Sequence, residues 1–331
     1  MNIFMVSNVL SYLFVVVVFQ LFFLMVNAPL FFYIISTLLF LSLLLIEIHT
    51  IKKEKNALIT QLTNNKHDPS MDLQTAKRVQ EALLAIDPPE SEKVEIVRRC
   101  TPATTLGGDF YTFVNKTVGK ISHQKNSKGI VEFVDQQDNI IGVTIGDVAG
   151  HGVSSALVMA LTSGLLGRIG LNNRSPAIIL QRANLDIQKF ISQSQISHVT
   201  AFYSTINLDE MTLTYSSAGH PPGIIIRSDL SYELLETDGI FMGMYKDEVY
   251  SEKVVKIHPG DRIFLYTDGI VETENSKKEP FGIQRIIDLA IIHWKKTPNE
   301  ILELVFEKLY EYREGNTQRD DQTLVIVDIK K

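Results

Sequence analysis

The sequence predicts an α+β fold: a sandwich of two antiparallel sheets flanked by helices, preceded by two transmembrane helices and a helical linker. The first 50 of the 331 residues contain one acidic residue, Glu47, and no Lys or Arg. Beyond residue 90, short apolar runs typical of strands come in consecutive pairs joined by turns, as at Asp209-Glu210. Runs with helical periodicity are grouped between these pairs, which disfavours a doubly wound parallel sheet. The predicted hairpin, linker and globular domain are residues 1–49, 50–89 and 90–331, respectively.

The N-terminal segment predicts a helical hairpin in a membrane. Its two apolar runs, residues 3–26 and 30–48, are separated by Asn27-Ala28-Pro29. Each run has close to the roughly 20 residues that a helix needs to cross a bilayer, and one span of the combined length would be too long. The lysine cluster at 52–55 places both the N-terminus and the C-terminal part in the cytoplasm. A cleaved signal peptide is the alternative, and the absence of a positively charged n-region argues against it.

The linker is predicted to be a polar helix over residues 50–86 that is interrupted at Asp68-Pro69-Ser70. Asp68 can cap a new helix with Pro69 at its first position. An apolar stripe then recurs at helical spacing, at Ala76, Val79, Leu83 and Ile86. The stripe fits two structures: a seam in a homodimer, or one helix packed on its own domain.

The C-terminal part predicts alternating groups of strands and helices. Strand patterns occur at 93–99, 109–114, 129–134, 139–145, 199–208, 211–216, 223–227, 249–257, 261–267 and 322–329. Helical patterns occur at 152–169, 176–193, 282–293 and 297–313. The polar stretch 115–128 is expected to form a surface loop or a long hairpin tip.

Composition narrows the classes of function. Residues 51–331 carry all 32 Lys and Arg and all but one of the 38 Asp and Glu, a balance that is ordinary for a soluble globular domain. This balance argues against a polytopic transporter, a disordered chain and a generally basic nucleic-acid binder. The single cysteine, Cys100, excludes an intramolecular disulfide and any cysteine-based zinc site, and it fits a reduced, cytosolic setting.

Isolated aspartates mark the ends of four predicted strands. Asp109 opens one strand, Asp147 follows another, Asp268 closes a third, and the pair Asp320 and Asp321 precedes the last. Several carboxylates share one place only when cations neutralise them, and a set of hard oxygens favours Mg²⁺ or Mn²⁺ over zinc. Taken singly, Asp268 is explained as a turn residue and Asp147 as a helix cap. The set of four positions is what indicates a metal site.

The segment 146–152, Gly-Asp-Val-Ala-Gly-His-Gly, joins a predicted strand to a predicted helix. Phosphate-binding loops occupy the same kind of position. This segment has neither the G-x-G-x-x-G spacing of a dinucleotide site nor the Gly-Lys-Ser/Thr end of a P-loop. Nucleotide binding is therefore disfavoured.

Several motifs follow one another between residues 75 and 329. They are Gln80-Glu81-Ala82-Leu83-Leu84, Leu106-Gly107-Gly108-Asp109-Phe110-Tyr111, Gly146-Asp147-Val148-Ala149-Gly150-His151-Gly152, Val199-Thr200-Ala201, Ala218-Gly219-His220-Pro221-Pro222, Pro259-Gly260-Asp261, Tyr266-Thr267-Asp268-Gly269 and Asp320-Asp321-Gln322-Thr323. In this order they resemble the SpoIIE/RsbU branch of the PPM-type (protein phosphatase 2C-like) metal-dependent serine phosphatases. The resemblance implies an αββα sandwich with a binuclear centre of two Mn²⁺ or Mg²⁺ ions at one end.

The resemblance also implies the ligands and the function. Asp147 would bridge the two ions. The full implied set is Asp109, Asp147, Val148 through its backbone carbonyl, Asp268, Asp320 and, as the less usual member of its pair, Asp321. The implied function is a phosphoprotein serine/threonine phosphatase in bacterial signalling. The N-terminal hairpin would anchor it in the inner (cytoplasmic) membrane in contact with lipid. The typical substrate is a phosphoserine on a STAS-domain anti-anti-sigma regulator. The alternative is a catalytically silent membrane scaffold that binds such a regulator.

Hydrolysis of a phosphoserine requires a proton for the departing serine oxygen. The candidates are His151, His220 or a metal-bound water, and residue type makes His151 the predicted catalytic histidine. No arginine can be assigned as a phosphate clamp from the sequence. The chain departs from the family pattern at Thr112, where relatives commonly carry Asp, and in the long stretch 115–138. Neither departure touches a predicted ligand, so we expect an active enzyme.

Overall fold

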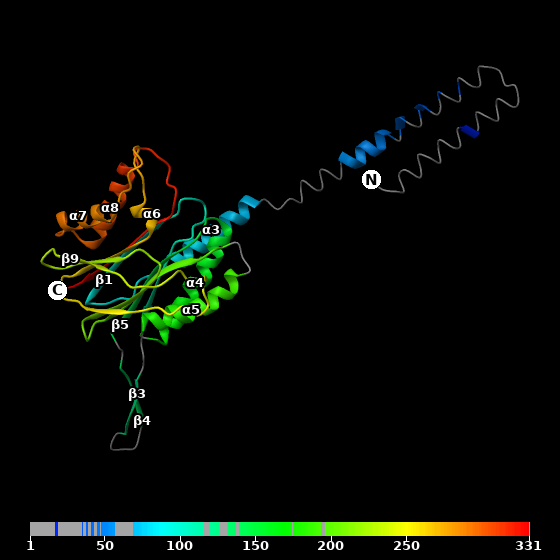
Figure 1. Ribbon diagram of the computed structural model, residues 1–331. Helices are drawn as coiled ribbons and strands as arrows, with labels where there is room; N and C mark the ends of the chain where they lie inside the picture. Colours follow the sequence, from blue (N-terminus) through cyan, green and yellow to red (C-terminus); the bar gives the residue numbers. More distant parts are fainter. Residues whose placement is uncertain are drawn as a thin grey trace. The chain divides into compact units, whose positions relative to one another are not determined.

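The computed structural model divides the chain into two compact units, Met1–Pro69 and Ser70–Lys331 (Figure 1). The described residues are 17, 18, 35, 38, 41, 42, 45, 46, 48–56, 69–115, 120–125, 131–136, 139–173, 175–192 and 196–330. We call Ser70–Lys331 the C-terminal unit.

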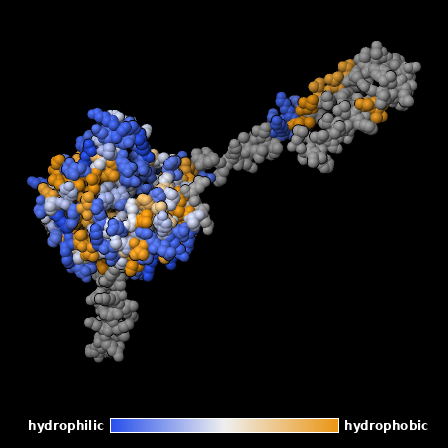
Figure 2. Space-filling model, viewed as in Figure 1, coloured by the Kyte–Doolittle hydropathy of each residue, from blue (hydrophilic) through white to orange (hydrophobic). Residues whose placement is uncertain are grey.

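The N-terminal unit holds the predicted membrane hairpin, most of which lies outside the described residues. Where the second apolar run is described it is helical, and Leu41, Leu45 and Ile48 are 53%, 62% and 53% exposed. Figure 2 shows this hydrophobic stretch giving way to a hydrophilic one, where the sequence reaches Lys52. A search of the described residues for helices long and apolar enough to cross a membrane finds one, α4 (Val153–Leu171), and it belongs to the C-terminal unit. The hairpin stays a prediction.

Helix α3 (Pro69–Leu84) packs on the rest of the C-terminal unit through a face other than the predicted stripe. Leu84 packs against the core, and Gln80 is only 5% exposed. By contrast, Val79 is 57% exposed, and Leu83 and Ile86 are also exposed. These three stripe residues are therefore only partly covered by their own domain.

Two five-stranded antiparallel sheets form the centre of the C-terminal unit. Sheet I has the order β1 (Val94–Thr101), β12 (Gln322–Ile329), β11 (Arg262–Tyr266), β8 (Gly223–Ile226) and β9 (Tyr232–Leu235). Sheet II has the order β10 (Lys253–Lys256), β7 (Thr212–Ala218), β6 (Val199–Asn207), β5 (Ile140–Val148) and β2 (Phe110–Asn115). A separate hairpin pairs β3 (Lys120–Lys125) with β4 (Val131–Gln136).

Helices cover the outer face of each sheet (Figure 1). Helices α4 and α5 (Pro176–Ile191) contact strands of sheet II, whereas α7 (Ile283–Ile292) and α8 (Pro298–Tyr312) contact strands of sheet I. Three apolar clusters result, one between the sheets and one under each helix layer. Since both faces of the central strands are buried, runs such as Leu324–Val327 are continuously apolar. The predicted α+β sandwich of two antiparallel sheets flanked by helices is confirmed.

Two helices begin at the residues that cap them. The Ser175 side chain accepts a hydrogen bond from the Ile178 amide, and Pro176 occupies the first turn of α5. Thr297 and Glu300 form a reciprocal capping box at α8. Both arrangements satisfy backbone amides that the first turn leaves unpaired.

The structure differs from the sequence expectations in four places. The stretch 115–128, expected to be a surface loop or a long hairpin tip, holds β3, one arm of the β3–β4 hairpin. The predicted strand 249–257 is reduced to β10. β9 was missed because its four residues at a sheet edge are too few to show a clear strand period. The short helix α6 (Asp268–Val271) was missed because four residues are too few to show a helical period.

The register of sheet II brings Gly146 into close contact with its neighbours. Gly146 of β5 lies opposite Phe110 of β2 and Ala201 of β6. A Cβ atom at this position would lie 2.4 Å from both the Phe110 ring and the Thr200 carbonyl oxygen. Only glycine fits here, directly before Asp147.

We predict that Gly146→Ala lowers the free energy of unfolding by about 1–3 kcal/mol, because the added methyl group overpacks a backbone contact. Gly164→Ala is the matched control: Gly164 lies on α4 with no atom within 4 Å of the new Cβ, so this change should be neutral or add roughly 0.5–1 kcal/mol. Urea unfolding followed by circular dichroism compares the two. Equal stabilities would contradict the packing argument.

Candidate functional site

The predicted acidic residues lie at one end of the sandwich, where strands of both sheets terminate. In sheet II, Asp109 directly precedes β2, and Asp147 is the next-to-last residue of the neighbouring β5. In sheet I, Asp268 follows β11, and Asp320 and Asp321 precede the neighbouring β12. Antiparallel pairing brings the end of one strand beside the start of the next, so residues far apart in the sequence meet here.

Asp109 is held between the two sheets. Its side chain is 2% exposed, and Oδ2 accepts hydrogen bonds from the hydroxyls of Thr267 at 2.8 Å and Thr323 at 2.6 Å. Burial raises the pKa of Asp109 well above its usual range, and the nearby Asp147 carboxylate raises it further. Asp109 therefore joins the acidic ends of sheets I and II directly.

Asp147, Asp268 and Asp320 form an electrostatically coupled group. Burial, followed by the charges of Asp268 and Asp320, raises the pKa of Asp147 to about 7. Burial is also the main cause of the raised pKa of Asp268 and of Asp320. In the part of the chain that the structure describes, no Lys or Arg forms an ion pair with any of these three residues or with Asp109. The negative charge of the group is therefore uncompensated.

The Val148 carbonyl faces the turn that carries Asp109. A Cβ atom on Gly108 would lie 2.5 Å from the Val148 oxygen and 3.0 Å from Asp147 Oδ1. The Val148 amide also donates to the Gly108 carbonyl at 3.3 Å. Glycine at 108 thus leaves room beside two of the oxygens that the sequence predicts as metal ligands.

Asp321 anchors a loop. It is 5% exposed, Oδ1 accepts from the Ala103 amide at 2.7 Å, and Oδ2 accepts from the Gly108 amide at 2.6 Å and the Asp109 amide at 3.4 Å. Because both oxygens serve backbone amides, we place Asp321 outside the proposed ligand set and retain Asp320.

The chemistry of this donor set fits a divalent cation. The donors are hard carboxylate and carbonyl oxygens, which Mg²⁺ and Mn²⁺ prefer. Burial and neighbouring carboxylates raise their pKa values, so a cation that neutralised their negative charge would be favoured here. Among the described residues, no three His, Cys, Asp or Glu side chains are gathered closely enough to hold an ion as they stand. The fit therefore rests on charge and donor type.

The two predicted histidines differ in their surroundings. His220 is 7% exposed, and burial lowers its pKa to about 3, so it is neutral at physiological pH. His151 is exposed in the loop after β5, and its effect on Asp320, whose pKa it lowers, shows that it lies near the acidic group. Of the two, His151 is the one suited to supply a proton.

Several residues that support the site were not assigned from the sequence. Thr267 and Thr323 each lie within one of the motifs, next to or near a predicted ligand. The Gln80 side chain donates to the Gly107 carbonyl at 2.7 Å and accepts from the Gly107 amide at 3.1 Å. The signal that could have identified Gln80 is a polar residue on the buried face of a helix. His198 was also missed. Burial lowers its pKa, and the charge of Asp268 opposes that shift without cancelling it.

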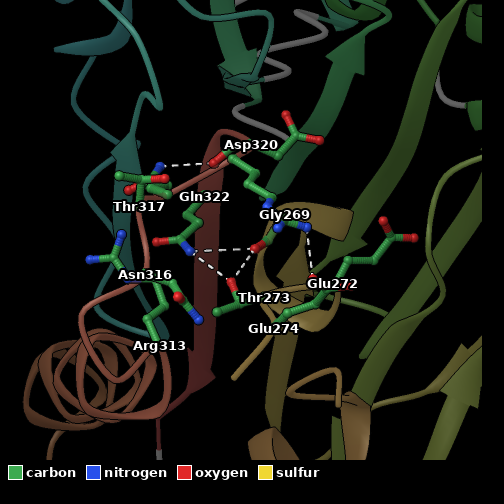
Figure 3. Close-up of a pocket in the computed structure, with 11 residues that line it drawn as sticks. Gly269, Glu272, Thr273, Glu274, Arg313, Asn316, Thr317, Asp320 and Gln322 are labelled. Carbon is green, nitrogen blue, oxygen red and sulfur yellow. Dashed lines mark hydrogen bonds and ion pairs between the residues drawn. The ribbon is translucent and has the colours of Figure 1, made fainter. Parts of the chain in front are cut away.

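A cavity of about 200 Å³ adjoins the acidic group (Figure 3). Figure 3 shows Asp320 at its edge and Gln322 bonded to Gly269 and Thr273. Arg313 and Arg319 also line it, and Arg319 donates to Glu274 at 2.7 Å. The sequence alone could not show that these two arginines lie beside the acidic group.

Comparison with known proteins identifies similar sequences and folds. Residues 137–330 match the family model described as Stage II sporulation protein E (SpoIIE). Phosphoserine phosphatase RsbU of Bacillus subtilis is 27% identical over 77% of this chain and 69% of its own length. Phosphoserine phosphatase RsbP of the same organism is 23% identical over 80% of this chain and 59% of its own length.

Two solved structures share the fold. The SiaA-PP2C domain of Pseudomonas aeruginosa has a TM-score of 0.60 at 22% identity, covering 78% of this chain and 95% of that domain. RsbX in complex with magnesium has a TM-score of 0.52 at 15% identity, covering 74% of this chain and all of RsbX. Both likenesses support the sandwich architecture.

We predict that Asp147→Asn stabilises the protein in the presence of a chelator. Since the pKa of Asp147 rises from 3.8 to about 7 on folding, the folded chain binds this proton more tightly, and stability falls as pH rises between those values. The amide should raise the Tm by several degrees at pH 8, with a smaller gain at pH 5. Exposed Asp247 provides the control Asp247→Asn. A lower Tm for Asp147→Asn at pH 8, measured by calorimetry, would refute the repulsion.

Proposed function

This chain belongs to the SpoIIE family and is a serine/threonine protein phosphatase of the PP2C type, and from that premise we propose that it is membrane-anchored and hydrolyses a phosphoserine with two Mn²⁺ or Mg²⁺ ions. The observation that carries the proposal is the uncompensated acidic group at the end of the sandwich. Burial raises the pKa of four carboxylates from both sheets, and neighbouring carboxylates raise it further, an arrangement that a cation-dependent site explains.

Each residue has a role in this proposal. Asp147 would hold both ions, with the Val148 carbonyl as an added oxygen at one of them. Asp109 would contribute to the same ion as Val148, while Asp268 and Asp320 would hold the other. Divalent cations at such a site supply Lewis acidity, since they lower the pKa of water and neutralise phosphoryl charge. RsbX, which shares the fold, was solved with magnesium, and this supports divalent metal dependence.

The chain's own residues would supply the proton to the leaving group, and its cysteine would not act as a nucleophile. His151 is exposed near Asp320, where it can donate a proton to the departing serine oxygen. Cys100 is not a candidate nucleophile, because burial and the charge of Asp109 raise the pKa of its thiol. Direct hydrolysis without a covalent phosphoenzyme fits these properties.

The substrate we propose is a phosphoprotein of the STAS-domain type. Relatives RsbU and RsbP are named phosphoserine phosphatases. The cavity beside Asp320 offers Arg319, which is 67% exposed, to a protein lying over the acidic group. A large substrate would contact this wall, and we expect a small phosphate ester to make fewer contacts with it.

The membrane location rests on the N-terminal sequence. Its two apolar runs and the following lysines support a hairpin anchor that leaves the C-terminal unit on the cytoplasmic face of the inner membrane. Lipid is then a constant partner of residues 1–49. The exposed stripe of Val79, Leu83 and Ile86 on and just after α3 is consistent with a homodimer through this helix.

We expect the purified full-length protein to hydrolyse p-nitrophenyl phosphate with Mn²⁺ and to stop when a chelator is added. Asp147→Asn and Asp268→Asn should each lower kcat/KM by more than the about 10–100-fold typical of changes outside the ligand shell. Activity that persists in both variants would refute the ligand assignment. Tight binding of a phosphorylated STAS-domain protein without phosphate release would favour the silent scaffold.

We also expect Arg319→Ala to raise KM severalfold for a phosphoprotein and to leave KM for p-nitrophenyl phosphate unchanged, because only the larger substrate spans the cavity. Arg168→Ala, an exposed arginine of α4, is the control. Steady-state kinetics with both substrates make the comparison. Equal changes for the two substrates would contradict a role in protein recognition.

A further inference from the structure

His220 lies where the chain crosses from one sheet to the other. It follows β7 of sheet II and precedes β8 of sheet I. The His220 amide donates to the Ser217 hydroxyl at 3.1 Å, and that hydroxyl donates to the His220 carbonyl at 3.1 Å. These bonds fix the backbone, so the position of the ring is set by the crossover itself.

On one side, the His220 ring reaches the strand that carries Asp147. Its Nδ1 atom lies 2.8 Å from the Thr200 hydroxyl. Thr200 is opposite Asp147 in the β5–β6 register, and the Asp147 amide donates to the same hydroxyl at 3.3 Å. Since the hydroxyl accepts from Asp147, its proton is free for Nδ1, and a longer 3.5 Å contact with the Asp147 carbonyl is the competing arrangement. One side chain thus separates the imidazole from the backbone of Asp147.

The other nitrogen of the ring is buried. A neutral imidazole that accepts at Nδ1 carries its proton on Nε2. Among the described residues, Nε2 makes no hydrogen bond. The ring is therefore held through Nδ1 by Thr200 and through its own backbone by the crossover between β7 and β8.

Metal ligands must be held to within about 0.5 Å of their working positions. Most of the contact between sheets I and II is apolar, and apolar burial has no preferred direction. Directional bonds at the acidic end are therefore needed to set the spacing of residues that come from different sheets. Thr267 and Thr323 provide one such link, through Asp109.

We propose that His220 is a positioning residue that holds Asp147 of sheet II in place through the Thr200 hydroxyl, with its own position fixed by the crossover to sheet I. This inference rests on the proposed metal role of Asp147. It gives His220 a function that needs no change of its protonation state and no contact with substrate.

The test compares isosteric variants of the full-length protein. Thr200→Val removes the hydroxyl, Thr200→Ser keeps it, His220→Asn keeps an acceptor near Nδ1, and His220→Leu keeps neither polar atom. Thr144→Val is the matched control, because Thr144 is a fully buried threonine on the same strand as Asp147 and its hydroxyl makes no hydrogen bond within the described residues. Mn²⁺ affinity is measured by isothermal titration calorimetry, together with Tm and with kcat and KM for p-nitrophenyl phosphate.

We expect Thr200→Val and His220→Leu to weaken Mn²⁺ binding about 10–100-fold, as changes around metal ligands do. Thr200→Ser, His220→Asn and Thr144→Val should stay within a few-fold of the parent protein. The inference is overturned if Thr200→Val and His220→Leu bind Mn²⁺ normally, whether their Tm falls or not. It is also overturned if kcat alone falls and loses its pH dependence, which would indicate a proton donor. If the parent protein hydrolyses no phosphoester and the two variants still lose Mn²⁺ affinity, the positioning role of His220 is supported and the proposed function is refuted separately.

Discussion

Repulsion among carboxylates at one end of the sandwich is the constraint on which this structure depends. Asp109, Asp147, Asp268 and Asp320 come from both sheets, and burial together with the charge of neighbouring carboxylates raises the pKa of each one. Such a group destabilises the fold unless it is neutralised. The surrounding structure must therefore hold these residues in place against their electrostatic repulsion. A bound cation would attract all of them and so stabilise the same arrangement.

Directional hydrogen bonds provide the necessary restraint. The threonine hydroxyls at 267 and 323 hold Asp109, and Asp321 holds the adjoining loop through three backbone amides. Gly108 and Gly146 allow backbone to approach where any side chain would collide. The apolar clusters supply most of the stability through burial, whereas these polar contacts determine where the acidic oxygens lie.

The sequence predicted the fold class and the positions of the acidic residues because both follow local patterns. Strand periodicity located the strands, and each aspartate was recognisable as a charge at the end of an apolar run. Contacts between distant segments carry no such local pattern. The anchoring role of Asp321, the buried setting of His220 and the exposure of Val79 depend on which strand or helix lies opposite. Edge strand β9 and helix α6 were missed because each has only four residues, too few to establish a period.

The most direct measurement is a crystal structure of the protein grown with Mn²⁺, with anomalous scattering recorded at the manganese edge. We predict two anomalous peaks among Asp147, Asp268 and Asp320, one of them beside the Val148 carbonyl. We also predict that Asp321 keeps its bonds to the amides of the 103–109 loop. Absence of manganese from this end of the sandwich, with Mn²⁺-dependent phosphatase activity intact, would contradict the proposed metal centre.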